Sequence, residues 1–500
     1  MRKIFMTIYP MNRRLNGRSD KGLSALIPVS VLFIIALSSC TKNLLNTVPK
    51  TTVSDANAFS TSDKILAGVN NLYSQVQTAS YFGGRYIVFN EQRGDEFSQN
   101  DGNNSTGANV WNQSITASGN FVNAVWTDAY AAINSANILI ANITNTTVIG
   151  DSLRKNYLAE AKFIRAFNYF NLVTTYAAPY AQNSSAAALP LRLTPSTSGG
   201  NNNFAFSKVS DVYTQILQDL NDAETDLPAA YATALLNESR AHKATAIALK
   251  TRVYLAKADY ANVIAEASKL VPAAAPYQYV SGSTTHRLET NIVTVFSGTY
   301  TGPEAIFFLP FVSPTEAPDN QSSLAYNYLY PILPLNTAGI VSDPVFGSTS
   351  ADARKGLVIT NTVGQQLVNK FSHNSVPYND YIPVIRYAEV LLNYAEAAAN
   401  NNDPATAIAL LNAVRQRSDP GYTFDPASID PSSTLIPTIL NERRIELLGE
   451  GFRTPDLLRR VQPLPAKTGN AGTAPEVLPT DANYVWPVPS SETAYNQLAP

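Results

Sequence analysis

The sequence predicts a mostly α-helical protein, with one large helical body and long irregular loops. Stretches with apolar residues at every third or fourth position recur along the chain, which is the pattern of amphipathic helices. Between them lie long segments rich in proline, glycine and asparagine, above all residues 271–380, which show no sustained helical period. No Gly/Ser linker or charge block divides the 500 residues, so we expect one large helical body.

The longest helical signal runs from Leu158 to Tyr180 and contains no glycine and no proline before Pro179. At about 100° per residue, its apolar side chains form two stripes, so this helix is expected to pack on two flanks. The first stripe contains Phe163, Ala166, Phe167, Phe170 and Val173, and the second contains Tyr169, Leu172 and Tyr176. We interpret the segment as a central scaffold helix, because its polar residues include no convergent set of titratable groups.

The other elements follow in order along the chain. Residues 41–60 are typical of an extended tether, and residues 79–119 of a loop region with more aromatic side chains than a solvated loop needs. Ala-x-x-x-Phe pairs at Ala159/Phe163 and Ala166/Phe170 match fragments of the tetratricopeptide pattern, so the helices are expected to pack as antiparallel hairpins. Further helices are predicted over residues 63–77, 120–143, 209–226, 242–256, 260–270, 383–400, 404–417 and 433–448.

The composition excludes some classes of partner. The 36 Lys and Arg residues against 38 Asp and Glu residues give a net charge of −2. The chain therefore has no basic stripe of the kind that a nucleic acid requires. Because only 15% of the residues are charged, the polar surface must come from Asn, Ser, Thr and the 26 tyrosines. Such a surface suits neutral, hydroxyl-rich ligands.

The N-terminal residues have the pattern of a bacterial lipoprotein signal. A basic region precedes the apolar run Leu23–Leu37, and the small residues Ser38 and Ser39 lead to Cys40, the only cysteine of the chain. We predict that residues 1–39 are removed and that Cys40 becomes the first residue of the mature chain. Acyl chains such as palmitate on Cys40 would then anchor the protein to a membrane. The alternative is an ordinary secretory signal that ends in a cysteine.

The densest cluster of charges is not interpreted as an active site. Glu442 and Glu446 lie four residues apart with arginines between them, which is the arrangement of structural ion pairs. Glu389 and Glu396 lie seven residues apart, or about 10.5 Å along a helix axis. That separation exceeds the spacing of glycosidase carboxylates, so a packing role is the better interpretation.

No metal and no cofactor are predicted. His242, His286 and His373 are isolated in the sequence and lack the spacing of zinc ligands. The oxygen-rich segment Asp101–Ser105 is not followed by the glycine at the sixth position or the glutamate at the twelfth position of a calcium loop. It is therefore interpreted as a flexible loop, with structural calcium as the alternative.

Four segments of the chain have recognisable motifs: EAKFIRAFNYF (160–170), RYAEVLLNYAEA (386–397), ERRIELLGEGFR with the following DL (442–457) and WPVPSSE (486–492). Together they resemble the SusD/RagB family of outer-membrane lipoproteins of Bacteroidota, which capture nutrients at the cell surface. The family usually has an aromatic residue where Gly449 stands, and often a Trp or Phe where Thr454 and Pro455 stand; both departures concern packing.

The resemblance implies a domain organisation for the mature chain, residues 40–500. It implies a tether over 40–60, a helical base of tetratricopeptide-like pairs and a loop-rich ligand region folded over that base. The base would comprise residues 61–79, 120–270 and 383–460, and the ligand region residues 80–119 and 271–380.

The resemblance also implies a function. The protein would bind an oligosaccharide or polysaccharide, or a peptide as in some relatives, and deliver it to a SusC-like TonB-dependent transporter at the outer membrane, facing outside. It would not be an enzyme. The alternatives are a surface glycan hydrolase and a helical scaffold that binds only protein.

Position in the family suggests six ligand-binding residues in the two loop regions. Aromatic rings stack on the C–H faces of sugars, while hydroxyl groups need Asn, Asp and Arg partners. The alternative is that the aromatic members only anchor long loops to the body. The predicted residues are Arg85, Asn100, Asp101, Trp111, Tyr326 and Tyr328.

Overall fold

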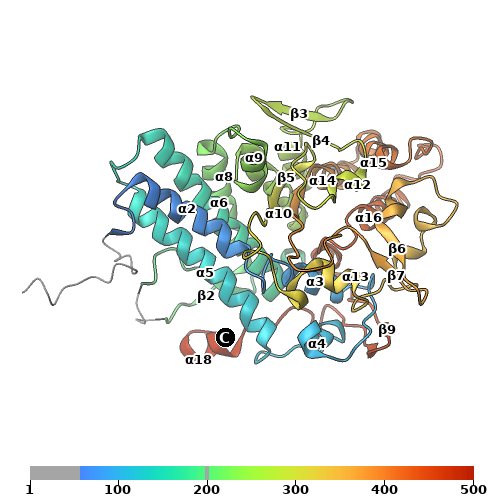
Figure 1. The fold of residues 1–500 in the computed structure, drawn as a ribbon, viewed down its shortest axis with the longest axis horizontal. Helices are drawn as coiled ribbons and strands as arrows, with labels where there is room; N and C mark the ends of the chain where they lie inside the picture. Colours follow the sequence, from blue (N-terminus) through green and yellow to red (C-terminus); the bar gives the residue numbers. More distant parts are fainter. Residues whose placement is uncertain (1–56, 198–201) are drawn as a thin grey trace, which may run out of the picture. The chain divides into compact units, whose positions relative to one another are not determined.

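Long helices make up most of the regular structure in the computed structural model, which describes residues 57–197 and 202–500 (Figure 1). The predicted signal, Cys40 and nearly all of the tether lie outside these residues. Ala58–Pro500 form one compact unit. Within the described ranges, no helix has both the length and the apolar character needed to span a membrane.

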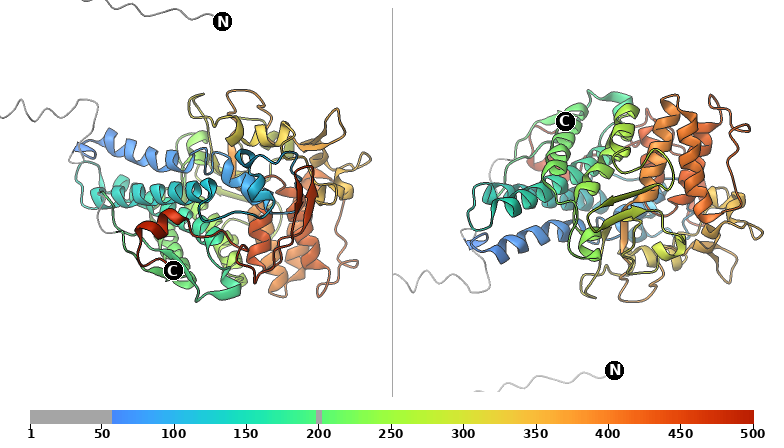
Figure 2. Two further views of the ribbon diagram at one scale, coloured as in Figure 1. Left: turned by 90° about the horizontal axis from the view of Figure 1, so that it is seen from below. Right: turned by 90° about the horizontal axis from the view of Figure 1, so that it is seen from above.

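The helical base is a row of longer helices in which each helix packs on the next. Helix α2 packs on α5, α5 on α6, α6 on α8, α8 on α10, α10 on α11, α11 on α14, and α14 on both α15 and α16. In both views of Figure 2, α2 and α5 lie at one end of this row and α14, α15 and α16, in orange, lie at the other. The helices are α2 (Ser62–Val76), α5 (Asn120–Ile143), α6 (Asp151–Tyr176), α8 (Val209–Asp226), α10 (Lys243–Ala256), α11 (Tyr260–Ala267), α14 (Tyr387–Asn400), α15 (Pro404–Ser418) and α16 (Leu435–Glu446).

Local sequence explains where several of these helices begin. The side chain of Thr61 caps α2 by accepting a hydrogen bond from the backbone N–H of Lys64 at 3.3 Å. Asp403 caps α15 in the same way, and Pro404 occupies a first-turn position where its missing N–H is not needed. The mostly helical fold is confirmed, and most predicted helix limits agree with the structure to within three residues.

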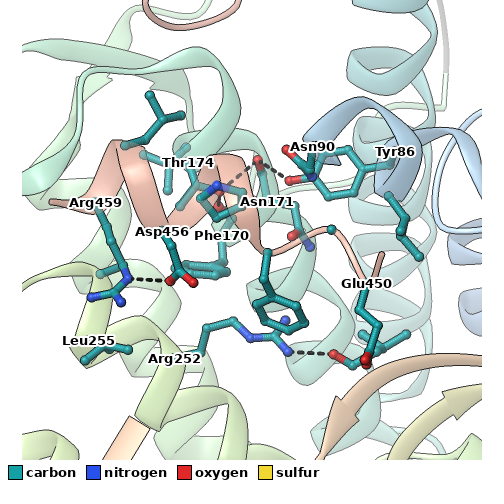
Figure 3. A pocket seen from close by; sticks show the side chains of 18 of the residues that line it. Tyr86, Asn90, Phe170, Asn171, Thr174, Arg252, Leu255, Glu450, Asp456 and Arg459 are labelled. Carbon is teal, nitrogen blue, oxygen red and sulfur yellow. Dashed lines mark hydrogen bonds and ion pairs between the residues drawn. The ribbon is translucent and has the colours of Figure 1, made fainter. Parts of the chain in front are cut away.

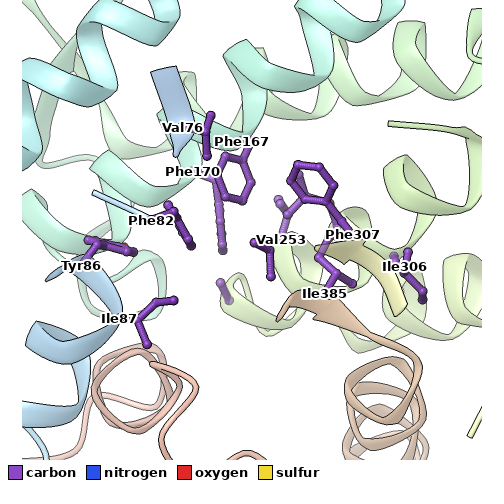
Figure 4. Close-up of a cluster of buried hydrophobic side chains, with 14 of the residues drawn as sticks. Val76, Phe82, Tyr86, Ile87, Phe167, Phe170, Val253, Ile306, Phe307 and Ile385 are labelled. Carbon is purple, nitrogen blue, oxygen red and sulfur yellow. The ribbon is translucent and has the colours of Figure 1, made fainter. Parts of the chain in front are cut away.

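Helix α6 is the centre of the core, as its two apolar stripes predicted. All eight residues of both stripes are buried, and the remaining face is buried as well. The ring of Phe167 lies 4.9 Å from that of Phe82 and 6.2 Å from that of Phe307, measured between centroids (Figure 4). The core around α6 therefore joins residues from the first loop region and from the irregular middle of the chain.

Short antiparallel ladders connect the helices. The ladder of β5 with β8 is wholly buried, and it occupies residues 382–386, where the sequence predicted the start of a helix. That prediction was wrong at its first four residues, because strand pairing with Ala305–Leu309 buries this segment on both faces. The pairs are β1 (Ala187–Pro190) with β2 (Phe206–Lys208), β3 (Gln278–Ser281) with β4 (Thr284–Arg287), β5 (Ala305–Leu309) with β8 (Ile382–Arg386), β6 (Val358–Thr360) with β7 (Gln366–Val368), and β9 (Lys467–Gly469) with β10 (Gly472–Ala474).

The two predicted loop regions contain short helices and lie against each other. The backbone N–H of Ser98 donates to the carbonyl of Pro334 at 2.9 Å, and that of Asn100 donates to Ile332 at 3.0 Å. Figure 1 shows α3, α4 and α13 close together where these segments meet. The short helices of these two regions are α3 (Arg85–Gln92), η2 (Asn104–Thr106), α4 (Ala108–Trp111), α12 (Ile292–Val295), η3 (Asn320–Ser322), α13 (Leu324–Leu329), η4 (Ile340–Ser342), η5 (Pro344–Phe346) and η6 (Ala353–Leu357). Short helices outside them are α7 (Tyr180–Asn183), α9 (Ala234–Ser239), α17 (Arg453–Arg459) and α18 (Ser490–Tyr495).

Candidate functional site

The charges of α16 form a buried ion-pair network. Arg386 contacts Glu446 at 3.0 Å and Glu450 at 2.7 Å, and it also bonds Glu304; each of these side chains is at most 1% exposed. Burial alone would raise the pKa of Glu446, but Arg417, Arg386 and Arg354 hold that pKa well below its usual range. The other members of the network are Asp352, Arg354, Lys370, Arg415, Arg417 and Glu442. The structural interpretation of this cluster is confirmed.

The two glutamates on α14 are also fully paired. Glu389 forms a bidentate pair with Arg252, with both N–O distances at 2.6 Å. Glu396 forms a bidentate pair with Arg459 at 2.7 and 2.6 Å. Neither carboxylate is free to act as a general acid or base.

The fold brings together two histidines that are far apart in the sequence. The rings of His242 and His286 are stacked with their centroids 5.2 Å apart, and both side chains are buried. Burial lowers the pKa of His242 to about 3 and that of His286 to about 4, so both are neutral near pH 7. Within residues 57–197 and 202–500, no three His, Cys, Asp or Glu side chains gather as metal ligands.

An enclosed cavity lies where α3, α6, α10 and α17 meet (Figure 3). Its volume is about 80 Å³, whereas pockets for small-molecule ligands measure about 300–1,000 Å³. The charged groups at its wall are already paired, as in the 2.8 Å contact between Arg459 and Asp456. This cavity has room for water molecules, and we do not assign it as the ligand site.

A stacked pair of tyrosines stands at the surface of the loop-rich face. The rings of Tyr326 and Tyr330, here called the tyrosine pair, lie 4.7 Å apart at an angle of 29°. Tyr330 is 46% exposed, and the buried Tyr378 supports Tyr326 edge-on at 6.2 Å. The hydroxyl of Ser323 caps α13 by accepting from the backbone N–H of Tyr326, which fixes the position of the first ring. The tyrosine pair therefore offers an aromatic surface that is held in place before any ligand arrives.

Asn100 contacts the backbone just after the tyrosine pair. Its side-chain amide donates to the carbonyl of Pro331 at 2.6 Å, and Pro331 directly follows Tyr330. Its oxygen accepts from Gln365 at 3.1 Å and from Asn470 at 3.0 Å. Three separate segments thus meet at the side chain of Asn100.

Asp101 and Arg85 flank this area and are only partly used by the fold. One oxygen of Asp101 accepts from Thr106 at 2.6 Å and shapes the turn, while the other has no partner among the described residues. Nη2 of Arg85 donates to the carbonyl of Ser105 at 2.6 Å, but its buried Nη1 has no hydrogen-bond partner in the part of the chain that the structure describes. Burial lowers the pKa of Arg85 to about 10, and Asp319 opposes this effect.

Trp111 and Tyr328 are placed differently from the other predicted ligand residues. Both are 0% exposed, so neither ring can stack on a ligand in this structure. The indole N–H of Trp111 donates to the carbonyl of Phe97 at 3.0 Å, and the hydroxyl of Tyr328 donates to Gly449 at 3.0 Å. These contacts correspond to the alternative in which the aromatic residues anchor loops. Their sequence context could not show this, because anchoring and ligand-stacking rings look alike in a loop.

Tyr330 is the residue that the sequence prediction missed. It lies four positions after Tyr326, which is about one helical turn, and α13 ends at Leu329. That spacing was the available signal for a second ring on the same face. As a set, the ligand residues stay a prediction, now centred on Tyr326, Tyr330 and Asn100.

Two family models match the chain. Residues 352–498 match the model described as SusD family, and residues 45–255 match the model described as starch-binding associating with outer membrane. SusD-like protein P2 of Formosa agariphila is 25% identical over 526 residues, which cover 93% of this chain and 96% of that protein.

Solved structures have the same fold. A SusD superfamily protein from Bacteroides fragilis superposes with a TM-score of 0.77 and 32% sequence identity, over 88% of this chain and 99% of the other. A laminarin-binding SusD-like protein superposes with a TM-score of 0.67 and 23% identity, over 87% of this chain and 98% of the other. The helical row, the loop-rich face and these matches lead to one conclusion: the chain belongs to the SusD superfamily, whose members are binding proteins rather than enzymes.

Proposed function

We propose that the protein is a lipid-anchored lipoprotein on the outside of the outer membrane that captures a neutral glycan and passes it to a TonB-dependent transporter. The tyrosine pair is the observation that supports a glycan as the ligand. An exposed and immobilised aromatic ring is what the flat C–H face of a sugar requires. The laminarin-binding relative and the starch-binding family model support the same class.

A hydrolytic function has no comparable support. Retaining and inverting glycosidases need two carboxyl groups that face one cleft about 5–10 Å apart. The candidate carboxylates Glu389, Glu396 and Glu442 are instead buried and bonded to arginines. The described residues therefore favour capture over cleavage.

The tyrosine pair can be tested with purified protein and neutral glucans. Tyr326→Ala and Tyr330→Ala should each weaken binding of laminarihexaose or maltohexaose by about 1–3 kcal/mol, because each removes a stacking surface. Isothermal titration calorimetry measures the change, and the melting temperature should shift little because Tyr330 is 46% exposed.

Tyr495→Ala is the matched control, since Tyr495 is also an exposed tyrosine, at 74%, but lies on α18. It should bind both glucans as the wild type does. Unchanged affinity in the Tyr326→Ala/Tyr330→Ala double variant would remove the tyrosine pair from the site.

The anchor can be tested separately. Cys40→Ala should release the protein from the membrane fraction, because the thioether-linked acyl chains that hold it there cannot form. A variant that is processed and still sediments with membranes would contradict the proposed anchor. Protease treatment of intact cells, which degrades only protein that faces outside, tests the orientation.

The transporter partner requires a complex isolated from native membranes. We expect co-purification with a TonB-dependent barrel in mild detergent, across an interface well above about 1,000 Å². Recovery of the lipoprotein only as a monomer from native membranes would argue against this partner.

A further inference from the structure

An open groove lies between α15, α16 and residues 343–351. Its volume is about 820 Å³, within the range of ligand pockets and about ten times that of the enclosed cavity. We call it the α15–α16 groove and define it by Asp343, Thr349, Arg415, Asp419, Tyr422 and Asn441. It shares no lining residue with the tyrosine pair.

The aromatic wall of this groove is built around Arg415. The guanidinium lies 4.6 Å from the ring centre of Tyr422 and 5.2 Å from that of Phe424, and the two rings meet edge-on at 4.9 Å. Tyr422 is 39% exposed, and its hydroxyl has no partner among the described residues. The groove thus has a partly exposed ring whose position is fixed by packing, as the tyrosine pair has.

Arg415 also provides a directed donor that the fold does not use. The residue is 7% exposed, and its Nε and Nη2 bond Glu442. Its Nη1 has no hydrogen-bond partner among the described residues, although Arg415 lines the groove. A buried guanidinium held in place by a carboxylate loses little side-chain entropy when it binds, so Nη1 is prepared for an oxygen acceptor.

The polar lining indicates the kind of ligand. The carboxylate of Asp419 has no partner among the described residues, and the hydroxyl of Thr349 has none either. The charged residues of the groove are one arginine and two aspartates, 1 − 2 = −1, so an anionic ligand is disfavoured. A donor, a free carboxylate, hydroxyl groups and an exposed ring together match the alternating hydroxyl groups and C–H faces of a neutral sugar.

We propose that the α15–α16 groove is a second glycan-binding site, in which Tyr422 stacks on a sugar ring while Arg415 and Asp419 bond its hydroxyl groups. The inference rests on the proposed function for its ligand class, but not on the tyrosine pair as the place of binding. Two sites on one chain would let a long glycan be held at separate points, which raises its effective affinity.

Hydrogen–deuterium exchange on the full mature chain can locate the ligand, with laminarihexaose and maltohexaose as probes. We expect slower exchange in peptides covering residues 415–424 and 433–441 when a probe is bound. Tyr422→Ala should weaken binding of the probe at the groove by about five- to a hundred-fold, and Asp419→Ala should also weaken it. Tyr422→Trp should retain binding at the groove, since a larger ring keeps the stacking surface. Arg415 is left intact because its loss would also break the contact with Glu442.

The Tyr326→Ala/Tyr330→Ala variant separates the two sites. Protection of the groove peptides that persists in this variant and disappears in Tyr422→Ala supports the inference. Protection confined to residues 97–103 and 324–332, with Tyr422→Ala binding as the wild type does, overturns the inference and leaves the proposed function standing. Protection at the groove alone supports the inference and overturns the tyrosine pair. No protection at either place with either probe overturns both.

Discussion

Two buried arginines, Arg386 of the base and Arg93 of the first loop region, have opposite kinds of partner. In the base, Arg386 is 1% exposed and lies against three carboxylates. In the loop-rich region, Arg93 is equally buried, but its side-chain hydrogen bonds to the described residues go to the amide oxygen of Gln113 and the carbonyl of Asn483. Lys467, 5% exposed, donates to the carbonyls of Gln92 and Gly94.

This difference indicates that the base is rigid, whereas the loop-rich face keeps groups that can still bind a partner. Opposite charges at short range fix the base strongly in a low-dielectric interior. Neutral oxygens satisfy the buried arginines of the first loop region less completely, and Nη1 of both Arg85 and Arg93 has no hydrogen-bond partner within residues 57–197 and 202–500. Burial lowers the pKa of Arg93 to about 9, and burial together with Arg93 lowers that of Lys467 well below its usual range. The loop-rich face thus retains polar groups that a ligand or water can still satisfy.

The largest expected effect is the loss of the central cation of the base. Arg386→Met should lower the free energy of unfolding by about 3–5 kcal/mol, because Glu304, Glu446 and Glu450 would remain buried without their shared partner. Urea denaturation at pH 7 measures the change. Arg154→Met is the control, since the pair of Arg154 with Asp151 is exposed and contributes about 0–1 kcal/mol. Equal losses in the two variants would mean that burial does not distinguish the network.

Acid should weaken the base specifically. Burial would raise the pKa of Glu450, but Arg386 and Lys370 lower it, and the pKa of Glu446 is also lowered. A carboxylate with a lowered folded-state pKa stabilises the fold above its unfolded pKa of about 4.3, and this contribution is lost as the pH falls through the folded pKa. We expect a loss of about 1–3 kcal/mol between pH 5 and pH 3 in urea denaturation. Glu450→Gln should show a shallower decline, and identical slopes would contradict the assignment.

A substitution in the loop-rich core should have a smaller effect on stability and almost none on binding. Trp111→Phe removes the indole bond to Phe97 and some packing, so the free energy of unfolding should fall by about 1–2 kcal/mol. Affinity for laminarihexaose in calorimetry should change less than about two-fold, in contrast to Tyr326→Ala. A loss of affinity as large as that of Tyr326→Ala would show that the buried indole supports the ligand surface.

Sequence patterns predicted the base well, because helix periodicity is a local property. The limits of α5 and α8 agree with the prediction to the residue, and both stripes of α6 are buried. The first residues of the predicted helix 383–400 were wrong, because their conformation is set by pairing with β5, which is distant in the sequence.

The candidate site was predicted only in part, for a similar reason. Whether an aromatic residue in a loop faces solvent depends on tertiary packing. Trp111 and Tyr328 are therefore indistinguishable from Tyr326 in the sequence, yet they are fully buried while Tyr326 is only partly buried. The α15–α16 groove is formed by three segments with no shared motif, so no sequence pattern indicated it.

The smallest expected effect tests whether Lys467, a buried lysine of β9 that contacts the first loop region, stabilises the fold through its charge. Lys467→Met retains a long apolar stem but removes a cation that burial and the nearby Arg93 both disfavour. It also leaves the carbonyls of Gln92 and Gly94 without their donor, a loss of about 1–3 kcal/mol that the relief of the charge offsets. The net change in the free energy of unfolding should therefore stay within about 1 kcal/mol at pH 7.

The pH dependence gives this prediction its sign. A lysine with a lowered folded-state pKa binds its proton more readily in the unfolded chain, whose lysine pKa is about 10.4. Between the folded and the unfolded pKa, a fall in pH therefore stabilises the unfolded state relative to the folded state. The wild type should consequently gain stability relative to Lys467→Met as the pH rises from 7 to 9.5 in urea denaturation. If Lys467→Met lowered the free energy of unfolding as much as Arg386→Met does, with no dependence on pH, the charge of Lys467 would stabilise the fold. That result would contradict the difference between Arg386 and the cations around the first loop region.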